Sequence, residues 1–196
     1  MALTSLRNLY LTELRDIYDA EERLLQHLPL LAEASFLPEL REAFNTHLAQ
    51  TKMQAERLQQ IFEKLGADPS GNPCKTMSGL IAECADVMTQ EKSADPGVFD
   101  AALIGAAQKI EHLEIASYGC ARTYAELLGE EDAAKLLQVS LEEEGETDRL
   151  LTRIAMRVNL EAAQATEKGS PGAAPPEPPP QPPSIIGELA QVRENE

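Results

Sequence analysis

Residues 101–129 read AALIGAAQKIEHLEIASYGCARTYAELLG and are the most informative part of the chain. Their apolar residues recur every three or four positions, as on one face of an α-helix. The same face carries acidic side chains; it comprises Ile104, Ala107, Glu111, Glu114, Ile115 and Tyr118. Gly129 suits a helix end, because glycine adopts the left-handed backbone of a C-cap without steric cost. The sequence therefore predicts a long helix over 98–128 that directs two carboxylates toward the protein core.

Three more stretches show the same helical periodicity, at 4–34, 38–65 and 131–163. Alanine, leucine, glutamate, glutamine and arginine dominate them, and no segment alternates apolar and polar residues with the period of a strand. The first two helices are joined by a short connection, and so are the last two. Short connections join antiparallel neighbours, so we predict two helical hairpins.

A much longer connection, residues 66–97, separates the two hairpins. It begins with GADPSGNPCK, whose glycines and prolines indicate a loop, and continues into a shorter predicted helix over 76–91. A connection of about 30 residues is long enough to run the length of a bundle. Four long helices with one long crossover form the ferritin-like arrangement. We therefore predict an all-α fold, a ferritin-like four-helix bundle whose crossover carries one extra short helix.

The composition changes near Lys168. Residues 169–183 read GSPGAAPPEPPPQPP and contain eight of the 13 prolines of the chain. Proline offers no backbone donor to a helix or sheet, so this segment favours an extended, polyproline-like conformation. We predict a bundle over 1–168 and a Pro-rich, acidic, disordered tail over 169–196. Polyproline segments bind aromatic grooves, so a protein partner for the tail is an open expectation.

The charge of the chain argues against two classes of partner. The 196 residues include 17 Lys+Arg and 33 Asp+Glu, a formal net charge of −16. Such a chain is poorly suited to nucleic acid or to an anionic membrane surface. No apolar run approaches the roughly 20 residues that span a bilayer. The first residues, MALTSLRNLY, lack the apolar stretch of a secretory leader. Cys74, Cys84 and Cys120 match no zinc-site or disulfide pattern, and we expect a cytoplasmic protein with reduced thiols.

Polar residues interrupt the apolar faces of all four long helices near their middles. Glu21, for example, lies between Ile17 and Leu24 on one helical face. The candidate metal ligands, one or two from each helix, are Glu21, His47, Glu111, Glu114, Glu144 and Asp148. Gln50 and Gln54 follow one of these ligands along its helix, and we interpret both as hydrogen-bond partners of the ligands.

Buried acidic groups need a compensating positive charge. Burying one unpaired carboxylate costs several kcal/mol, and several carboxylates close together also repel one another. Lys and Arg are missing from these helical faces at this height, apart from Arg57 and Arg122 at the edges. Metal ions would compensate the charge, and carboxylates with an imidazole suit iron or manganese better than metals that prefer thiolates. The sequence therefore predicts a di-iron or di-manganese centre inside the bundle.

The chain resembles the YciF-like branch of the ferritin-like superfamily over residues 4–160. The resemblance rests on four stretches: LYLTELRDIYDAEERLLQHLP, HLAQTKMQAERLQQIFEKLG, AALIGAAQKIEHLEIASYGCARTYAELLG and LLQVSLEEEGETDRLLTRIA. It implies a four-helix bundle with a di-metal centre, a homodimer and a link to bacterial stress responses.

Carried over by position, the resemblance implies the ligands Glu21, His47, Glu111, Glu114 and Glu144. Two of these form a Glu-x-x-Glu pair similar to that of rubrerythrin-like proteins. The superfamily usually has a histidine three residues after the glutamate of the last helix. This chain has Thr147 at that position, and Asp148 is the candidate substitute.

Two functions remain open at this point. The first is metal-dependent stress defence, by peroxide or oxygen chemistry or by iron handling. The second is a non-catalytic structural or interaction protein that uses the bundle surface and the Pro-rich tail. The two differ in whether the purified protein contains metal and consumes peroxide.

Overall fold

The computed structural model describes residues 4–91 and 94–169, and every regular element within them is an α-helix. Five helices follow one another: α1 (Leu6–Ala34), α2 (Pro38–Leu65), α3 (Lys75–Met88), α4 (Pro96–Leu127) and α5 (Glu131–Gly169). The all-α prediction is confirmed, and so is the short helix in the crossover. The tail predicted over 169–196 lies outside the described residues from position 170 onward.

The local sequence explains where several helices begin and end. At the start of α1, the Ser5 hydroxyl accepts a hydrogen bond from the backbone N–H of Asn8 at 3.2 Å. At the start of α4, the Asp95 carboxylate accepts hydrogen bonds from two backbone N–H groups of the first turn. Gly66 follows α2 with a φ of 58°, in the left-handed region where glycine is favoured.

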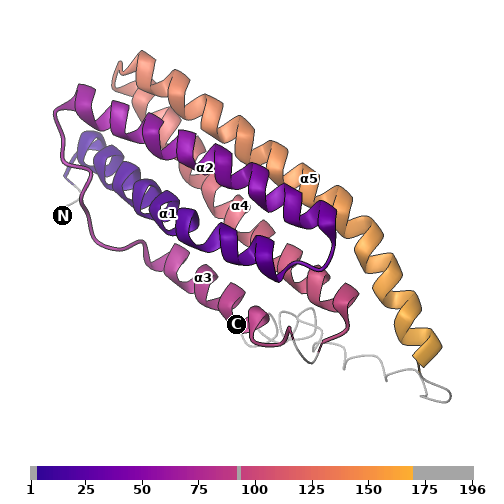
Figure 1. Cartoon of the computed structure of the whole chain (residues 1–196). Helices are drawn as coiled ribbons and strands as arrows, with labels where there is room; N and C mark the ends of the chain where they lie inside the picture. The colour runs from indigo at the N-terminus through magenta and orange to yellow at the C-terminus, as the bar shows by residue number, and fades with distance from the viewer. Residues whose placement is uncertain (1–3, 92–93, 170–196) are drawn as a thin grey trace, which may run out of the picture.

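The four long helices form a bundle, with α1 and α2 as one pair and α4 and α5 as the other (Figure 1). Between the pairs, α1 packs against α4 and α2 packs against α5. Three exposed ion pairs connect the helix ends across the bundle: Arg7–Glu130, Lys64–Asp132 and Arg157–Glu39. Exposed pairs of this kind contribute little to stability, so the interior must hold the bundle together.

The crossover runs along the bundle and places α3 against α4 and α1 (Figure 1). Its start is fixed to α1 by Asp19, whose carboxylate accepts hydrogen bonds from the Cys74 backbone N–H and from Arg23 Nε, each at 2.7 Å. Its end is fixed by Asp100, the fifth residue of α4. That carboxylate accepts hydrogen bonds from two backbone N–H groups of the turn between α1 and α2.

The interior consists of two apolar clusters with a polar layer between them. The first cluster includes Tyr10, Leu14, Ile17, Leu58, Tyr118 and Leu137. The second includes Leu24, Leu28, Phe44, Leu103, Ile110 and Leu151. On each long helix, the residues between one cluster and the other include buried polar side chains, namely Glu21, His47, Thr51, Gln54, Glu111, Glu114, Ser140, Glu144 and Thr147. The polar layer therefore crosses the whole bundle at one height.

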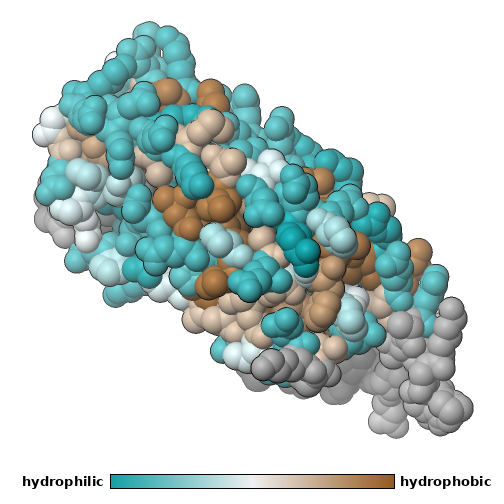
Figure 2. All heavy atoms as spheres, viewed as in Figure 1, coloured by the Kyte–Doolittle hydropathy of each residue, from teal (hydrophilic) through white to brown (hydrophobic). Residues whose placement is uncertain are grey.

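The fifth helix is longer than predicted, because it continues past 163 to Gly169 and extends beyond the other helices (Figure 1). Residues 162–168 contain no glycine or proline and are rich in helix-forming types, so nothing ends the helix before the glycine. On the face shown in Figure 2, hydrophilic residues surround separate hydrophobic patches. Among the described helices, none is long and apolar enough to cross a membrane.

Candidate metal centre

Four buried side chains converge in the polar layer. They are His47 from α2, Glu111 and Glu114 from α4, and Glu144 from α5, and each is at most 2% exposed. One ligand atom of each lies within 4.8 Å of those of the others. The two glutamates of α4 are three residues apart and therefore project from the same face of the helix.

A fifth buried carboxyl, Glu21 on α1, borders this group. Its side chain is fully buried, and its Oε1 atom accepts a hydrogen bond from the Tyr118 hydroxyl on α4. Its Oε2 atom has no hydrogen-bond partner. Burial raises the pKa of Glu21, and the charge of Glu144 raises it further, so the two carboxyls interact. All four long helices thus contribute a polar side chain to one region.

Gln54 and Arg57 on α2 connect the group to the bundle surface. Gln54 Nε2 donates hydrogen bonds to Glu144 Oε1 at 2.5 Å and to Glu143 Oε2 at 3.1 Å. Arg57 donates two hydrogen bonds to the carboxylate of Glu143, at 2.6 and 2.8 Å. This bidentate pair neutralises the charge of Arg57, which is therefore a poor counterion for the buried carboxyls.

His47 presents its two ring nitrogens to different surroundings. Nε2 lies 3.3 Å from Glu111 Oε1 and 3.8 Å from Glu144 Oε2. Nδ1 lies 3.4 Å from the Thr147 hydroxyl of α5. Burial lowers the pKa of His47 to about 4, so the ring is neutral near pH 7. Neutral imidazole is the form that binds metal ions.

The carboxyls of this region have strongly perturbed pKa values. Burial, together with repulsion from the neighbouring carboxylates, raises the pKa values of Glu21, Glu111 and Glu114 well above their ordinary range. Burial also raises the pKa of Glu144 to about 7. The metal-free interior therefore favours carboxylic acids over carboxylates. A bound cation would take the place of these protons, because ligand carboxyls must be deprotonated.

Six atoms of the five candidate ligands receive no hydrogen bond from an N–H or hydroxyl group of the described residues. They are Glu21 Oε2, His47 Nε2, Glu111 Oε2, both carboxyl oxygens of Glu114, and Glu144 Oε2. Buried polar atoms nearly always have a partner, so six together require an explanation. Carboxylate oxygens and an imidazole nitrogen form a donor set that suits iron and manganese. The residues present therefore fit a metal centre.

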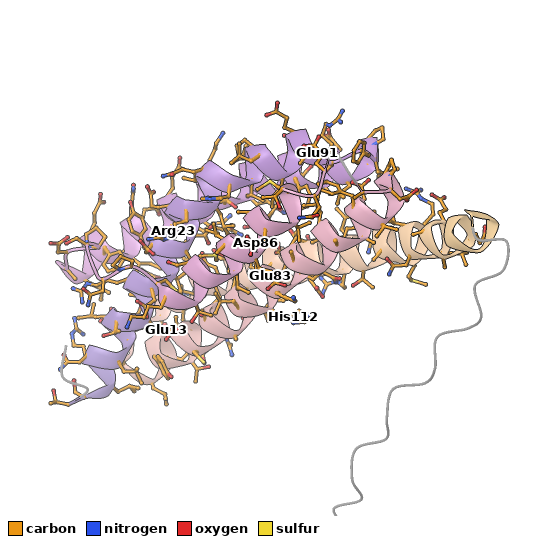
Figure 3. All side chains as sticks on the ribbon, turned by 90° about the horizontal axis from the view of Figure 1, so that it is seen from below. Glu13, Arg23, Glu83, Asp86, Glu91 and His112 are labelled. Carbon is orange, nitrogen blue, oxygen red and sulfur yellow. The ribbon has the colours of Figure 1, made fainter. Side chains whose placement is uncertain are left out.

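The structure brings four of the six predicted ligands within 4.8 Å of one another, places Glu21 beside them, and does not bring Asp148 into the group. Asp148 accepts a hydrogen bond from Gln108 on α4 at 3.0 Å and lies 3.5 Å from His112. The His112 side chain is 68% exposed on the outside of α4, away from the site (Figure 3). Four helical residues turn the chain about 400°, so Asp148 is rotated by about 40° from Glu144, toward α4.

One residue beside the site was missed from the sequence. Glu143 lies in the run Glu142–Glu143–Glu144, which is typical of a solvated face. In the structure its side chain is 17% exposed and binds Arg57 and Gln54. These two donors are three residues apart on α2, and that spacing was the available signal for an acceptor on the facing helix.

Comparisons with known proteins agree with the helical architecture. A family model described as a domain of unknown function, DUF892, matches residues 5–164. Protein YciF of Escherichia coli (strain K12) is 43% identical over 157 residues, which cover 80% of this chain and 93% of YciF. The crystal structure of this E. coli stress protein matches with a TM-score of 0.76 at 42% identity, covering 80% of this chain and 98% of that one.

Two further structures have the same fold. YcfI of Rhodopseudomonas palustris is 39% identical, with a TM-score of 0.72, and the match covers 76% of this chain and 94% of that one. A protein from Xanthomonas campestris pv. campestris is 20% identical, with a TM-score of 0.66 over 83% of this chain and 99% of that one. At this identity, the similarity to the Xanthomonas protein concerns the fold alone.

Proposed function

This chain belongs to the DUF892 family of YciF-like proteins, and from that premise we propose that it binds two iron or manganese ions in the polar layer of its bundle. The proposed ligands are Glu21, His47, Glu111, Glu114 and Glu144. Asp148 is not among them, because its carboxylate is hydrogen-bonded to Gln108 on the flank of α4.

The six acceptor atoms without a partner are the observation that supports the proposal most directly. Metal ions would bind their lone pairs and remove the energetic cost of leaving them unpaired. The charge supports two ions rather than one. Glu21, Glu111, Glu114 and Glu144 would carry four negative charges once ionised, which two divalent cations balance, whereas the nearest arginine is already paired.

When bound, such a centre supplies reactivity toward peroxide or oxygen, or the capacity to oxidise iron(II). The residues of the chain bind and orient it. Tyr118 orients Glu21 and Gln54 orients Glu144 through hydrogen bonds, and the two apolar clusters exclude water on either side. The E. coli relative is described as a stress protein, and we extend a role in stress defence to this chain.

Two further features complete the proposal. We expect a homodimer, which light scattering coupled to size-exclusion chromatography would test. We also expect a cytoplasmic location, since Cys74, Cys84 and Cys120 are all unpaired, as thiols are in a reducing compartment. Cell fractionation would test the location.

Elemental mass spectrometry of protein purified without added metal tests the proposed centre. We expect about two iron or manganese ions per chain, and their loss in Glu114→Gln and Glu144→Gln. Glu142→Gln is the matched control, because Glu142 is exposed on α5 two residues before Glu144. Metal-free wild-type protein, or variants that keep both ions, would contradict the proposal.

A non-catalytic structural or interaction protein is the second candidate. It is favoured by one relative, since YcfI of R. palustris carries a provisional description as a structural protein. This candidate predicts a folded protein that contains no metal and consumes no peroxide. The same elemental analysis, with a peroxide-consumption assay, therefore separates the two functions.

A further inference from the structure

Thr147 lies between His47 and Gln50 where α2 and α5 meet. Its hydroxyl donates a hydrogen bond to Gln50 Oε1 at 3.3 Å and lies 3.4 Å from His47 Nδ1. Burial lowers the pKa of His47, and the Gln50 side chain opposes part of that effect. Thr147 is only 6% exposed, and Gln50 is half-buried at the edge of the groove between α2 and α5. The three side chains form a small network on the side of the imidazole that faces away from the carboxyls.

The hydrogen atoms in this network can be assigned by counting. A threonine hydroxyl has one hydrogen, and here it is donated to Gln50 Oε1. Thr147 Oγ1 can then only accept a hydrogen bond from His47, and Gln50 Oε1 is an acceptor too. With the Thr147 hydrogen held by Gln50, the contact between Thr147 Oγ1 and Nδ1 requires a proton on Nδ1. A neutral imidazole carries one N–H, so Nε2 keeps a free lone pair.

We propose that Thr147 and Gln50 are positioning residues that hold His47 in the tautomer protonated on Nδ1, and so present Nε2 as a metal ligand. Nε2 is the ring atom that faces Glu111 and Glu144. The role in metal binding rests on the proposed function. The tautomer itself is a property of the metal-free chain and can be measured without any metal.

The opposite tautomer also has a partner, which makes the inference testable. A proton on Nε2 would point at Glu111 Oε1, 3.3 Å away. In that case the Thr147 hydroxyl would have to turn its hydrogen from Gln50 Oε1 to Nδ1, and its hydrogen bond to Gln50 would be lost. Thr147 on one side of the ring and Glu111 on the other therefore compete for the proton. Removal of Thr147 Oγ1 and Gln50 Oε1 should shift the proton toward Nε2.

Long-range proton–nitrogen NMR of metal-free, nitrogen-15-labelled protein reports which ring nitrogen carries the proton. The signals of His47 are assigned with His27→Gln and His112→Gln, which remove the other two histidines of the chain. We expect Nδ1–H in the wild type and in Thr147→Ser, which keeps the hydroxyl. We expect a shift to Nε2–H in the double variant Thr147→Val/Gln50→Leu. A wild-type spectrum with Nε2–H overturns the inference even if the double variant does not fold.

Manganese(II) affinity supplies the second measurement. Hydrogen-bond partners of metal-binding histidines are typically worth about 10–100-fold in affinity, so we expect a loss of this size in the double variant. Thr147→Ser should bind like the wild type. Thr46→Val is the matched control, since Thr46 lines the same groove between α2 and α5 but is exposed.

The outcomes separate this inference from the proposed function. Equal affinity in the double variant and the wild type overturns the positioning role and leaves the metal centre intact. A wild-type chain that binds neither manganese nor iron overturns the proposed function, and the ligand role of Nε2 with it. An unchanged Nδ1–H signal in the double variant shows that Thr147 and Gln50 do not set the tautomer.

Discussion

Tyr118 and Glu21 are joined by a hydrogen bond across the bundle, where the polar layer meets an apolar cluster. The hydroxyl on α4 donates to Oε1 of the carboxyl on α1, and both side chains are fully buried. Desolvation by burial raises the pKa of Tyr118 well above its ordinary value, so the phenol keeps its proton and remains a donor. This contact fixes the orientation of Glu21 and leaves its second oxygen without a protein partner.

Tyr118→Phe should lower the free energy of unfolding of the metal-free protein by about 1–3 kcal/mol, the usual cost when a buried polar group loses its partner. Tyr10→Phe is the matched control. Tyr10 is also fully buried, but its hydroxyl has no hydrogen-bond partner, so its removal should cost nothing or stabilise slightly. Urea denaturation measures both changes. Equal losses in the two variants would mean that the Tyr118 hydroxyl does not stabilise the fold.

The stability of the metal-free protein should fall as the pH rises above neutrality. In the unfolded chain the glutamates ionise near their ordinary value of 4.5, whereas the folded chain holds protons on Glu21, Glu111 and Glu114 to much higher pH and on Glu144 to about 7. The stabilisation from these raised pKa values is fully present below pH 4.5. It is lost as the pH rises through the folded values, by up to about 1.4 kcal/mol per pH unit for each proton retained.

His47 acts in the opposite direction and at lower pH. Its pKa falls from 6.5 in the unfolded chain to about 4 in the folded protein, so its stabilisation is present above pH 6.5 and is lost as the pH falls through 4. Above pH 6.5 only the loss of stability caused by the buried carboxyls remains. We therefore choose pH 6.5–8.5 as the range in which to measure stability. Thermal unfolding with and without manganese(II) should show a metal-induced stabilisation that grows with pH. A stabilisation that is constant over this range would contradict proton release by these carboxyls.

Helical periodicity was sufficient to predict which residues face the interior. On one helix, a single angle relates each side chain to the apolar face, so Glu21, Glu111 and Glu144 could be placed from Ile17, Ile104 and Leu137 without knowledge of the neighbouring helices. The burial of all three carboxyls follows from that angle. The order of the helices around the bundle came from the lengths of the connections.

The choice between Thr147 and Asp148 could not be made in this way. Both lie within one helical turn of Glu144, on opposite flanks, at steps of about 300° and 400°. Which flank meets His47 depends on α2 packing on one side of α5 and α4 on the other. That arrangement is a property of the assembled bundle, and the sequence of α5 alone does not contain it.

Alkylation should distinguish two of the cysteines. Cys84 on α3 is 2% exposed, and burial raises the pKa of its thiol to about 11, whereas Cys120 on α4 is exposed. The thiolate is the reactive form, so iodoacetamide at pH 8 should label Cys120 and leave Cys84 unmodified in the native protein. Peptide mass spectrometry measures the labelling, with protein unfolded in urea as the control. Native Cys84 that reacts as fast as in urea would mean that α3 does not stay packed on the bundle.

Asp100 should be one of the most sensitive positions outside the metal centre. Its carboxylate is 2% exposed and accepts hydrogen bonds from the backbone N–H groups of Phe36 and Leu37, at 3.0 and 2.7 Å, which ties the start of α4 to the turn between α1 and α2. Asp100→Ala leaves both N–H groups without this acceptor, so we expect urea denaturation to show a loss of about 1.5–3 kcal/mol. Asp95→Ala is the matched control, because it removes the exposed N-cap of the same helix and should cost about 1 kcal/mol. If Asp100→Ala cost no more than Asp95→Ala, the carboxylate would not be holding the two hairpins together.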